Sequence, residues 1–383
     1  MTEWKEYKLG VIATFSQGIQ VDINLQSYVK NDEDVRFIRI VDYTKKGEEI
    51  PRFIKNPGDK YLVSDSDLVM IRYGSQTAGK IVRGISGAIA NNMFKIALNK
   101  SIADNIYMYY WLSRPVVLDY FMQSQASSTM PAITFDMLGK MDIYLPPLPE
   151  QIRIASILSS LDDKIDLLHR ENKTLEAMAE TLFRQWFIEE AKEDDMCLLG
   201  EVIKTTSGGT PSRKNEEYYC NGNIEWVKSK ELHHSYILDT EEKITIEAVH
   251  NSSAKLLPEN SILIAMYGAT VGEYGIIAKS MTCNQAICAL IPNEKYPYTY
   301  LYLWAKFMQD EFINLACGAA QQNISQELIK QQYVSNDIKL ISDFHILVNP
   351  YMEKMKVNQE QIQTLIQQRD GLLPKLMSGE VKI

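Results

Sequence analysis

A heptad pattern near the middle of the chain constrains the fold more than any other feature of the sequence. Within Pro149–Phe187, core positions recur at alternating steps of four and three residues, and Asn172 is the single polar member. The series comprises Ile154, Leu158, Leu161, Ile165, Leu168, Asn172, Leu175, Ala179, Leu182 and Trp186. It predicts a helix from Glu150 to Phe187, roughly 55 Å long at 1.5 Å per residue. An apolar seam of this length has to be buried against a partner.

The second half of the chain repeats the first at an offset of about 190 residues, which indicates a duplicated domain. The run SDLVMIRYG returns as NSILIAMYG, so that Tyr73 corresponds to Tyr267. In the same order, ANNMFKIAL returns as CNQAICAL, YMYYWL returns as YLYLWA, and SSTMPAIT returns as AAQQNIS. Each copy therefore predicts a mixed α/β domain that leads into a long helix.

A second seam near the C-terminus supplies the partner for the first. It comprises Phe344, Val348, Tyr351, Met355, Asn358, Ile362, Leu365, Arg369 and Leu372. We expect Pro350 to kink or restart this helix. The simplest closed arrangement packs the two helices antiparallel and relates the two domains by a pseudo-twofold axis. In that arrangement Asn172 meets Asn358 and sets the register; the alternative is two partly exposed asparagines.

The fold class predicted from these features is α+β, with two duplicated mixed α/β domains separated by two long antiparallel coiled-coil helices. The predicted segments are residues 1–148, 149–190, 196–341 and 342–383. Within the first domain, Val35–Thr44 and Asp67–Gly74 are predicted to be strands. Residues Ala103–Ser124 are predicted to be helical, with a break at Pro115.

Composition restricts the class of protein without identifying a function. The chain contains no apolar run long enough to cross a membrane, and its first residues lack a signal-peptide core. Its five cysteines form no CxxC pair and favour reduced thiols over a disulfide or zinc framework. The net charge is −9, of which Pro146–Asp195 contributes −6 through 6 basic and 12 acidic residues. Such a run is typical of a solvated helix face.

Catalytic motifs are not evident in the sequence, and no catalytic or metal-binding residue is predicted. The run Ser207–Arg213 resembles a phosphate-binding loop but lacks the Gly-Lys-Ser/Thr ending, which favours a turn entering a domain. We find no Ser-His-Asp arrangement, dinucleotide fingerprint, NPPY-type methylase run or nuclease carboxylate cluster.

Polar loops at matched positions of the two copies are the remaining candidates for a site. Asn, Gln, Arg and Lys side chains read base edges, and Ser, Thr and Lys suit phosphates, although solvated loops have the same composition. The candidate DNA-binding residues of the first copy are Arg72, Tyr73, Gly74, Ser75, Gln76, Lys80, Arg83, Asn91, Asn92, Ser128 and Thr129. Those of the second copy are Arg213, Lys214, Lys228, Lys230, Tyr267, Gly268, Thr270, Asn284, Gln285, Gln321, Gln322 and Asn323.

Four motifs together resemble the specificity (S) subunit of type I restriction–modification systems. They are PPLPEQIRIASILSSLDDKI, SGGTPS followed by GNIEWVKSKEL, AAQQNIS, and the tail RDGLLPKLMSGEV. The resemblance extends from end to end. Three stretches depart from the family pattern: FSQGIQVD stands in place of the first GGTPS-type loop, SSTMPAIT replaces a glutamine-rich loop, and KLISDFHI precedes the second helix.

The resemblance implies a non-catalytic subunit that reads a bipartite site in double-stranded DNA. Two modification (M) subunits would dock on the helices and methylate adenine with S-adenosylmethionine. Restriction (R) subunits, bound through the resulting core, would add translocation and cleavage that need ATP and Mg. The chain itself would need no cofactor and would be cytoplasmic, DNA-associated and part of phage defence. The alternatives are the recognition part of a fused restriction–methylation enzyme and a coiled-coil scaffold.

Overall fold

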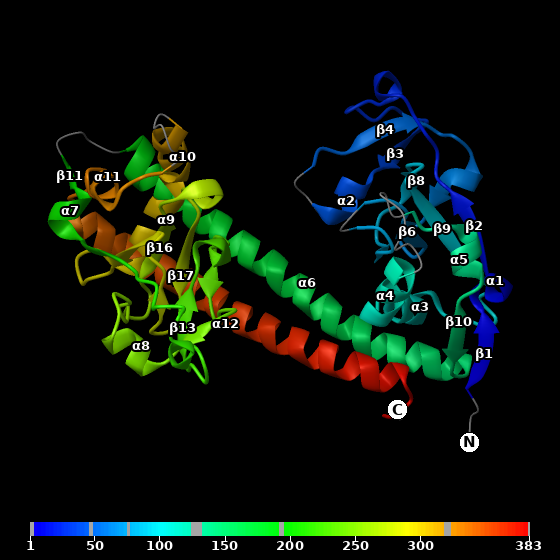
Figure 1. The fold of residues 1–383 in the computed structure, drawn as a ribbon. Helices are drawn as coiled ribbons and strands as arrows, with labels where there is room; N and C mark the ends of the chain where they lie inside the picture. The colour runs from blue at the N-terminus through cyan, green and yellow to red at the C-terminus, as the bar shows by residue number, and fades with distance from the viewer. Residues whose placement is uncertain are drawn as a thin grey trace. The chain divides into compact units, whose positions relative to one another are not determined.

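The computed structural model describes residues 4–45, 49–74, 77–123, 132–190, 195–317 and 323–381. The chain forms two compact units: unit 1 is Met1–Asp163 with Ile366–Ile383, and unit 2 is Lys164–Leu365. The long helices α6 (Leu148–Arg184) and α12 (Ile338–Met377) each contribute one part to each unit (Figure 1). The boundaries expected from the sequence instead give each helix a segment of its own.

Unit 1 contains three small sheets within its described residues, with strand orders β2-β9-β6-β7, β4-β3-β8-β5 and β1-β10. The strands are β1 (Lys5–Lys8), β2 (Ala13–Gln17), β3 (Asp34–Ile38), β4 (Arg52–Lys55), β5 (Leu62–Val63), β6 (Leu68–Ile71), β7 (Ile81–Val82), β8 (Gly87–Ile89), β9 (Met93–Leu98) and β10 (Asp142–Leu145). The helices that precede α6 are α1 (Leu9–Ile12), α2 (Ile40–Thr44), α3 (Asn105–Leu112), α4 (Pro115–Gln123) and α5 (Phe135–Gly139).

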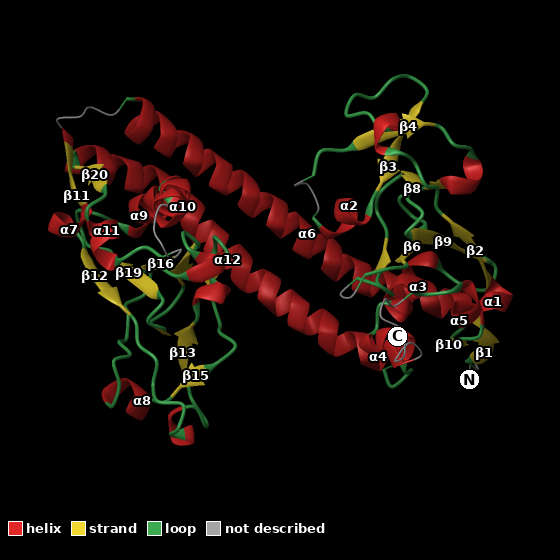
Figure 2. Ribbon diagram, turned by 45° about the horizontal axis from the view of Figure 1, so that its top comes forward, coloured by secondary structure: helices red, strands yellow, loops and turns green. Residues whose placement is uncertain are grey.

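Unit 2 has the corresponding orders β12-β19-β16-β17-β14, β15-β13-β18 and β11-β20 within its described residues (Figure 2). The strands are β11 (Met196–Leu198), β12 (Lys204–Ser207), β13 (Ile224–Val227), β14 (Tyr236–Ile237), β15 (Lys243–Ile244), β16 (Ile262–Ala265), β17 (Tyr274–Ile277), β18 (Thr282–Cys283), β19 (Ile287–Ile291) and β20 (Tyr333–Ser335). The helices are α7 (Leu199–Val202), α8 (Ile246–His250), α9 (Tyr298–Phe307), α10 (Gln309–Cys317) and α11 (Gln326–Lys330).

The two topologies correspond almost strand for strand, which confirms the predicted duplication. The orders β2-β9-β6-β7 and β12-β19-β16-β17 are equivalent, and unit 2 adds β14 at the end of its sheet. In the second sheet, β3 pairs parallel with β8 as β13 pairs parallel with β18. The shared pattern means that loops at equivalent strand ends occupy equivalent places in the two units.

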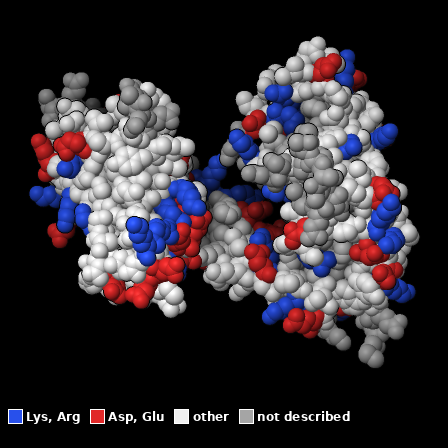
Figure 3. All heavy atoms as spheres, in the orientation of Figure 1, with Lys and Arg blue, Asp and Glu red and all other residues white. Residues whose placement is uncertain are grey.

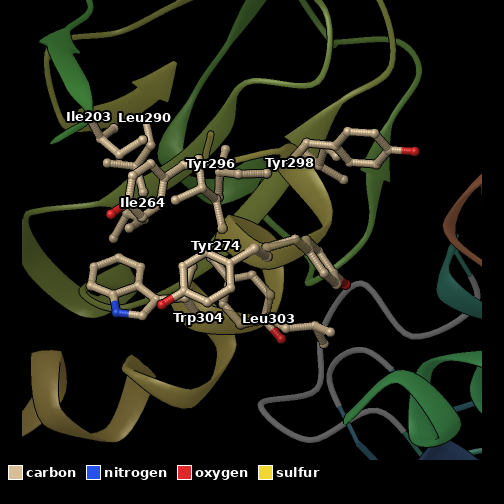
Figure 4. Packing of buried hydrophobic residues seen from close by; sticks show 14 of the residues in the cluster. Ile203, Ile264, Tyr274, Leu290, Tyr296, Tyr298, Leu303 and Trp304 are labelled. Carbon is tan, nitrogen blue, oxygen red and sulfur yellow. The ribbon is translucent and has the colours of Figure 1, made fainter. Parts of the chain in front are cut away.

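The central strands β6 and β16 of the two main sheets are buried on both faces, and their successive side chains pack on opposite sides of the sheet. In β6, Leu68 and Met70 pack with helices α3 and α6, while Val69 and Ile71 pack with the second sheet. The same alternation recurs in unit 2. There Ile264 of β16 joins Leu290 of β19 in a core that also includes Tyr274 and Trp304 (Figure 4).

Local predictions for unit 1 are partly right. The predicted strand Val35–Thr44 is wrong in its second half, because the strand ends at Ile38 and α2 follows. The buried Asp42 carboxylate accepts hydrogen bonds from the Arg39 backbone at 2.8 Å and the Arg39 Nε at 3.0 Å, which stabilises this first turn. The predicted helix over Ala103–Ser124 is confirmed as α3 and α4, with Pro115 at the first position of α4.

Of the two outcomes expected at Pro350, a kink or a restart, the restart does not occur, because α12 is continuous from Ile338 to Met377. A proline inside a helix costs about 3 kcal/mol. Phe344, Val348 and Met352 flank it and are at most 1% exposed. Burying such side chains contributes roughly 1.5–3 kcal/mol each, which outweighs the lost hydrogen bond.

The two seams are buried or half-buried along both helices, and no seam side chain is exposed. Within unit 2, the helices run antiparallel. The Phe187 ring lies 5.2 Å from the Phe344 ring, whereas Asn172, fifteen positions earlier in α6, contacts Asn358, fourteen positions later in α12. Within unit 1, Arg369 Nη1 lies 2.8 Å from Asp162 Oδ1.

The two seam asparagines meet, which confirms that prediction. Asn358 is fully buried, and its Nδ2 donates to Asn172 Oδ1 at 2.8 Å and to Glu171 Oε2 at 3.0 Å. Asn172 Nδ2 in turn donates to the Met355 carbonyl at 3.3 Å. A buried amide pair restricts register, because a shifted register would leave both side chains without partners.

Among the described residues, none of the helices has the length and apolar character needed to cross a bilayer. All five cysteines are unpaired.

We expect the asparagine pair to show strong coupling in a double-mutant cycle. Asn172→Leu or Asn358→Leu alone should lower the free energy of unfolding by about 1–3 kcal/mol, because the remaining amide loses one of its hydrogen-bond partners in a buried seam. The double substitution should recover most of this loss, because two leucines suit an apolar seam. Urea unfolding of the full chain measures all four states, and additive effects would contradict the pairing.

Candidate nucleic-acid interface

In unit 1, three loops meet at one end of the main sheet. Strand β6 ends at Ile71 opposite Met93, the first residue of β9, and β2 ends at Gln17 beside Phe94. Because neighbouring strands are antiparallel, the end of one lies beside the start of the next. The loops that begin at Arg72 and Gly18 therefore lie next to the loop that precedes β9.

Hydrogen bonds hold these loops together. The Arg72 backbone N–H donates to the Asn92 carbonyl at 2.8 Å, and the Arg72 carbonyl accepts from the Ile133 N–H at 3.2 Å. The Arg72 guanidinium lies 4.9 Å from the centre of the Tyr73 ring. Asn91 Nδ2 donates to Gln20 Oε1 at 3.1 Å. The structure thus brings Arg72, Tyr73 and the two asparagines into one polar cluster.

The two predicted cations that follow this turn have different positions. Lys80 lies at the same end of the sheet, since its carbonyl accepts from the Ile71 N–H at 2.9 Å, and its side chain is exposed. Arg83 lies beyond β7, with its guanidinium 4.9 Å from the ring centre of Tyr109 in α3. The structure therefore places Lys80, but not Arg83, with the polar cluster.

In unit 2, the same three loops meet at the equivalent end of the sheet. Ala265, the last residue of β16, lies opposite Ile287, the first residue of β19, and Ser207 ends β12 beside Cys288. The turn Gly268–Thr270 follows, and Tyr267 beside it is 42% exposed.

Contacts between these loops repeat those of unit 1. The Thr210 hydroxyl donates to the Gln285 side-chain carbonyl, as Asn91 donates to Gln20 in unit 1. Asn323 pairs with Tyr267, and its Oδ1 accepts from the Gly268 N–H at 3.4 Å. The structure thus gathers Tyr267, Gly268, Thr270, Asn284, Gln285 and Asn323.

The sequence prediction did not include Gln17, Gln20 or Thr210, although all three belong to these clusters. Gln17 Nε2 donates to the Asn91 carbonyl at 2.9 Å. The repeat offset of about 190 residues aligns Gln20 with Thr210. Applying that offset to the end of β2 and to the loop that follows it would have found these residues. Six predicted residues lie outside the described part of the chain: Ser75, Gln76, Ser128, Thr129, Gln321 and Gln322.

Glycine is required where the loop after β2 passes close to the segment before β9, and where the loop after β12 passes close to the segment before β19. A Cβ on Gly208 would lie 2.1 Å from the Cys283 carbonyl oxygen, and a Cβ on Gly18 would lie 2.2 Å from that of Ala90. The Ser207–Arg213 run therefore uses its first glycine for close backbone packing, which supports the turn interpretation over a phosphate loop.

The predicted basic residues of unit 2 form ion pairs that the sequence prediction did not include. Lys228 Nζ lies 3.1 Å from Glu241 and 3.0 Å from Glu242. Lys230 lies 2.6 Å from Glu241, and Arg213 lies 2.6 Å from Glu242. These cations are therefore not the free charges that the sequence suggested, whereas Lys214 is exposed.

The ion pairs keep both carboxylates ionised. Hydrogen bonding from Lys230, and then from Lys228, lowers the pKa of Glu241. Hydrogen bonding from Lys228 lowers the pKa of Glu242 despite partial burial. Burial lowers the pKa of Lys228, but its hydrogen bonds to Glu242 and Glu241 outweigh burial and hold that pKa above its usual value. At neutral pH the cluster carries opposed full charges.

The chemistry of both clusters is hydrogen bonding and charge recognition. Amide, hydroxyl and guanidinium groups supply the donors and acceptors that base edges and phosphates require. Among the described residues, no group of three or more His, Cys, Asp or Glu side chains is arranged to hold a metal ion.

Comparisons with known proteins identify the relatives of this architecture. The family model for the type I restriction modification DNA specificity domain matches residues 1–177 and 193–335. The MjaIX specificity subunit of Methanocaldococcus jannaschii is 27% identical over 317 residues, which cover 76% of this chain and 73% of that protein. The HindI specificity subunit of Haemophilus influenzae is 25% identical over the full length of both chains.

The fold is also similar to that of a solved structure. The S subunit of a type I restriction–modification system from M. genitalium superposes with a TM-score of 0.65 at 17% identity, covering 98% of this chain and 96% of that one.

We predict that Gly18→Ala and Gly208→Ala destabilise the chain, because each new methyl group overlaps a carbonyl oxygen. The loss should be at least about 1–3 kcal/mol, as for other overpacked sites. Gly371→Ala is the matched control: it lies in α12 with no atom within 4 Å of the new Cβ, and should stabilise by about 0.5–1 kcal/mol. Thermal unfolding compares the three variants, and equal melting temperatures would show that the close approach is not restrictive.

Proposed function

Because this chain belongs to the type I restriction–modification DNA specificity family, we propose that it reads a bipartite site in double-stranded DNA. The observation that carries the proposal is the recurrence of one polar loop cluster in both units. Each cluster lies at the same end of an equivalent sheet. One cluster per unit suits recognition of one half-site each.

The side chains of the clusters support base reading together with phosphate contact. Asn91, Asn92 and Gln285 carry amides, which form paired hydrogen bonds with adenine in the major groove. Arg72 carries the planar donor set that matches guanine. Thr270 and Lys80 suit phosphate oxygens. The residue types differ between the two clusters, so the proposed half-sites differ in sequence.

The two long helices are proposed to set the spacer between the half-sites. Each runs without interruption from one unit into the other. The hydrogen-bonded pair of Asn172 and Asn358 restricts their register. A spacer of fixed length follows if both helices keep that register.

The partners proposed for the complex are two modification subunits on the helices and restriction subunits bound through them. Part of the acidic charge on α6 is used internally: Glu176 and Glu180 pair with Lys306, and Asp162 pairs with Arg369. Asp163 and Asp166 remain exposed and are the better candidates for docking. In this proposal, S-adenosylmethionine binds the modification subunits, ATP and Mg serve the restriction subunits, and this chain is not catalytic.

Genome-wide mapping of methylated adenine tests the proposal. A strain that contains this gene and its modification subunit should carry N6-methyladenine in a two-part motif with a constant spacer, and deletion of the gene should remove it. Replacing Tyr267–Thr270 and Asn284–Gln285 should alter one half of the motif only. Unchanged methylation after deletion would contradict the proposal. If the complex methylated DNA although this chain made no contact with the duplex, a scaffold role would be favoured.

Matched insertions in the two helices should change the spacer and leave the half-sites unchanged. Four residues after Lys173 and four before Asn358 lie on the same side of the asparagine pair, because the helices are antiparallel, and add about 6 Å of helix, which corresponds to about two base pairs. The accompanying rotation is expected to alter the spacer or abolish methylation. Four residues after the exposed Gly58 are the control and should leave the spacer as it was. A change in half-site sequence would contradict the spacer role.

A further inference from the structure

Five charged residues of unit 2 form what we call the acid-paired cluster: Arg213, Lys228, Lys230, Glu241 and Glu242. Glu242 bridges Arg213 and Lys228, and Glu241 bridges Lys228 and Lys230. The nitrogen–oxygen distances lie between 2.6 and 3.1 Å. Two carboxylates thus face three cations, and little positive charge is left to attract an anion.

The backbone segments that carry the acid-paired cluster are held together by Glu231. Glu231 accepts hydrogen bonds from the Lys228 N–H at 2.8 Å and from the Glu241 N–H at 2.7 Å, so it fastens the two segments together. The Arg213 guanidinium stacks 4.3 Å from the Tyr219 ring centre and 5.2 Å from that of Trp226. The opposed charges are therefore built into the fold.

The acid-paired cluster is continuous with the candidate interface. Val227, which precedes Lys228, accepts a hydrogen bond from the Asn284 N–H at 2.9 Å. The Trp226 indole N–H donates to the Gly209 carbonyl at 3.0 Å, one residue before Thr210. Any duplex that contacts Thr210 and Gln285 therefore encounters these charges.

Unit 1 differs in this respect. Its cluster contains Arg72 and Lys80, and among the described residues neither has a carboxylate within ion-pair distance. Elsewhere on the surface such pairing is common, and on the face seen in Figure 3 many Lys and Arg side chains adjoin Asp or Glu. Pairing of interface cations with acids is thus a property of unit 2.

Building on the proposed function, we propose that Glu241 and Glu242 suppress sequence-independent attraction of DNA phosphates to unit 2. A phosphate that approaches Lys230 or Arg213 has to compete with a carboxylate already in place. Sequence-independent affinity comes from cations that neutralise phosphates and release counterions. With those cations paired, binding at unit 2 depends on base contacts from its polar loops.

The solvent-exposed ion pairs of the cluster add little to stability. Glu241 and Lys230 are 58% and 59% exposed, and Arg213 is 54% exposed. Ion pairs this open to solvent contribute little to folding. Glu242 and Lys228 are less exposed, at 35% and 16%, but the Gln side chain keeps an oxygen that can accept a hydrogen bond from Lys228, so the double substitution is expected to leave the fold intact.

The test compares the wild type with Glu241→Gln/Glu242→Gln, as the full chain and as its complex with the modification subunits. Fluorescence anisotropy with a labelled 30-base-pair random duplex, over a NaCl series, gives affinity and salt dependence. Each cation released to a phosphate steepens the log–log salt slope by about 0.9. We expect a slope steeper by about 1–2 and an affinity about tenfold higher at low salt.

A control variant separates local pairing from net charge. Glu201→Gln/Glu294→Gln removes the same two charges at the opposite end of the main sheet, where β12 begins and β19 ends. It should change neither quantity. Adding Lys230→Gln to the double variant should reverse part of the gain. Circular dichroism checks that every variant is folded.

Three results would overturn the inference. If the wild type binds DNA and the double variant has the same salt slope, the inference is contradicted and the proposed function is not. An equal shift in the control shows that net charge is responsible. Absence of duplex binding by wild type and variant, in both preparations, contradicts the proposed function as well.

Discussion

Burial of an apolar stripe along each long helix is the constraint on which the other features depend. Neither α6 nor α12 can keep its seam in water, and each seam is buried against the other helix and the main sheet of a unit. In unit 2, Phe183 of α6 and Phe187, in the π-helical turn Gln185–Glu189 that follows it, pack with Phe344 of α12 and with Tyr300 of α9. The helices are therefore part of the core of each unit. A change in their register would disturb the sheet that carries the loops.

The sequence predicted those features that local or repeated patterns encode. The period of the seam gives the helices, and the offset between YMYYWL and YLYLWA gives the duplication. It did not predict α2, since a single Arg39–Asp42 turn overrides a run with high strand propensity. The restart that it allowed at Pro350 does not occur, because burial of flanking residues depends on packing that local propensity does not contain.

The candidate site was predicted in part for the same reason. Strand ends determine which loops meet, so matched runs such as Asn91-Asn92 and Asn284-Gln285 could be found from the repeat. The ion pairs of Lys228 with Glu241 and Glu242 join residues thirteen and fourteen positions apart across two loops. No periodicity encodes such a contact. The net charge of each segment therefore indicated that unit 2 is acidic. It did not show that particular carboxylates pair with the cations of the candidate interface.

Comparison of the two copies shows which positions can vary. Both copies have glycine at the equivalent positions Gly18 and Gly208, because a Cβ at either position would overlap a carbonyl oxygen of the neighbouring segment. Gln20 and Thr210 differ, yet each hydrogen-bonds a side-chain amide on the loop that precedes the next strand. Backbone sterics thus restrict the positions that shape the loops, whereas hydrogen bonding at their tips requires only a polar group. If the proposed function holds, a scaffold with these two kinds of position acquires a new half-site by changing tip residues, since neither the sheet nor the helix seam depends on their identity.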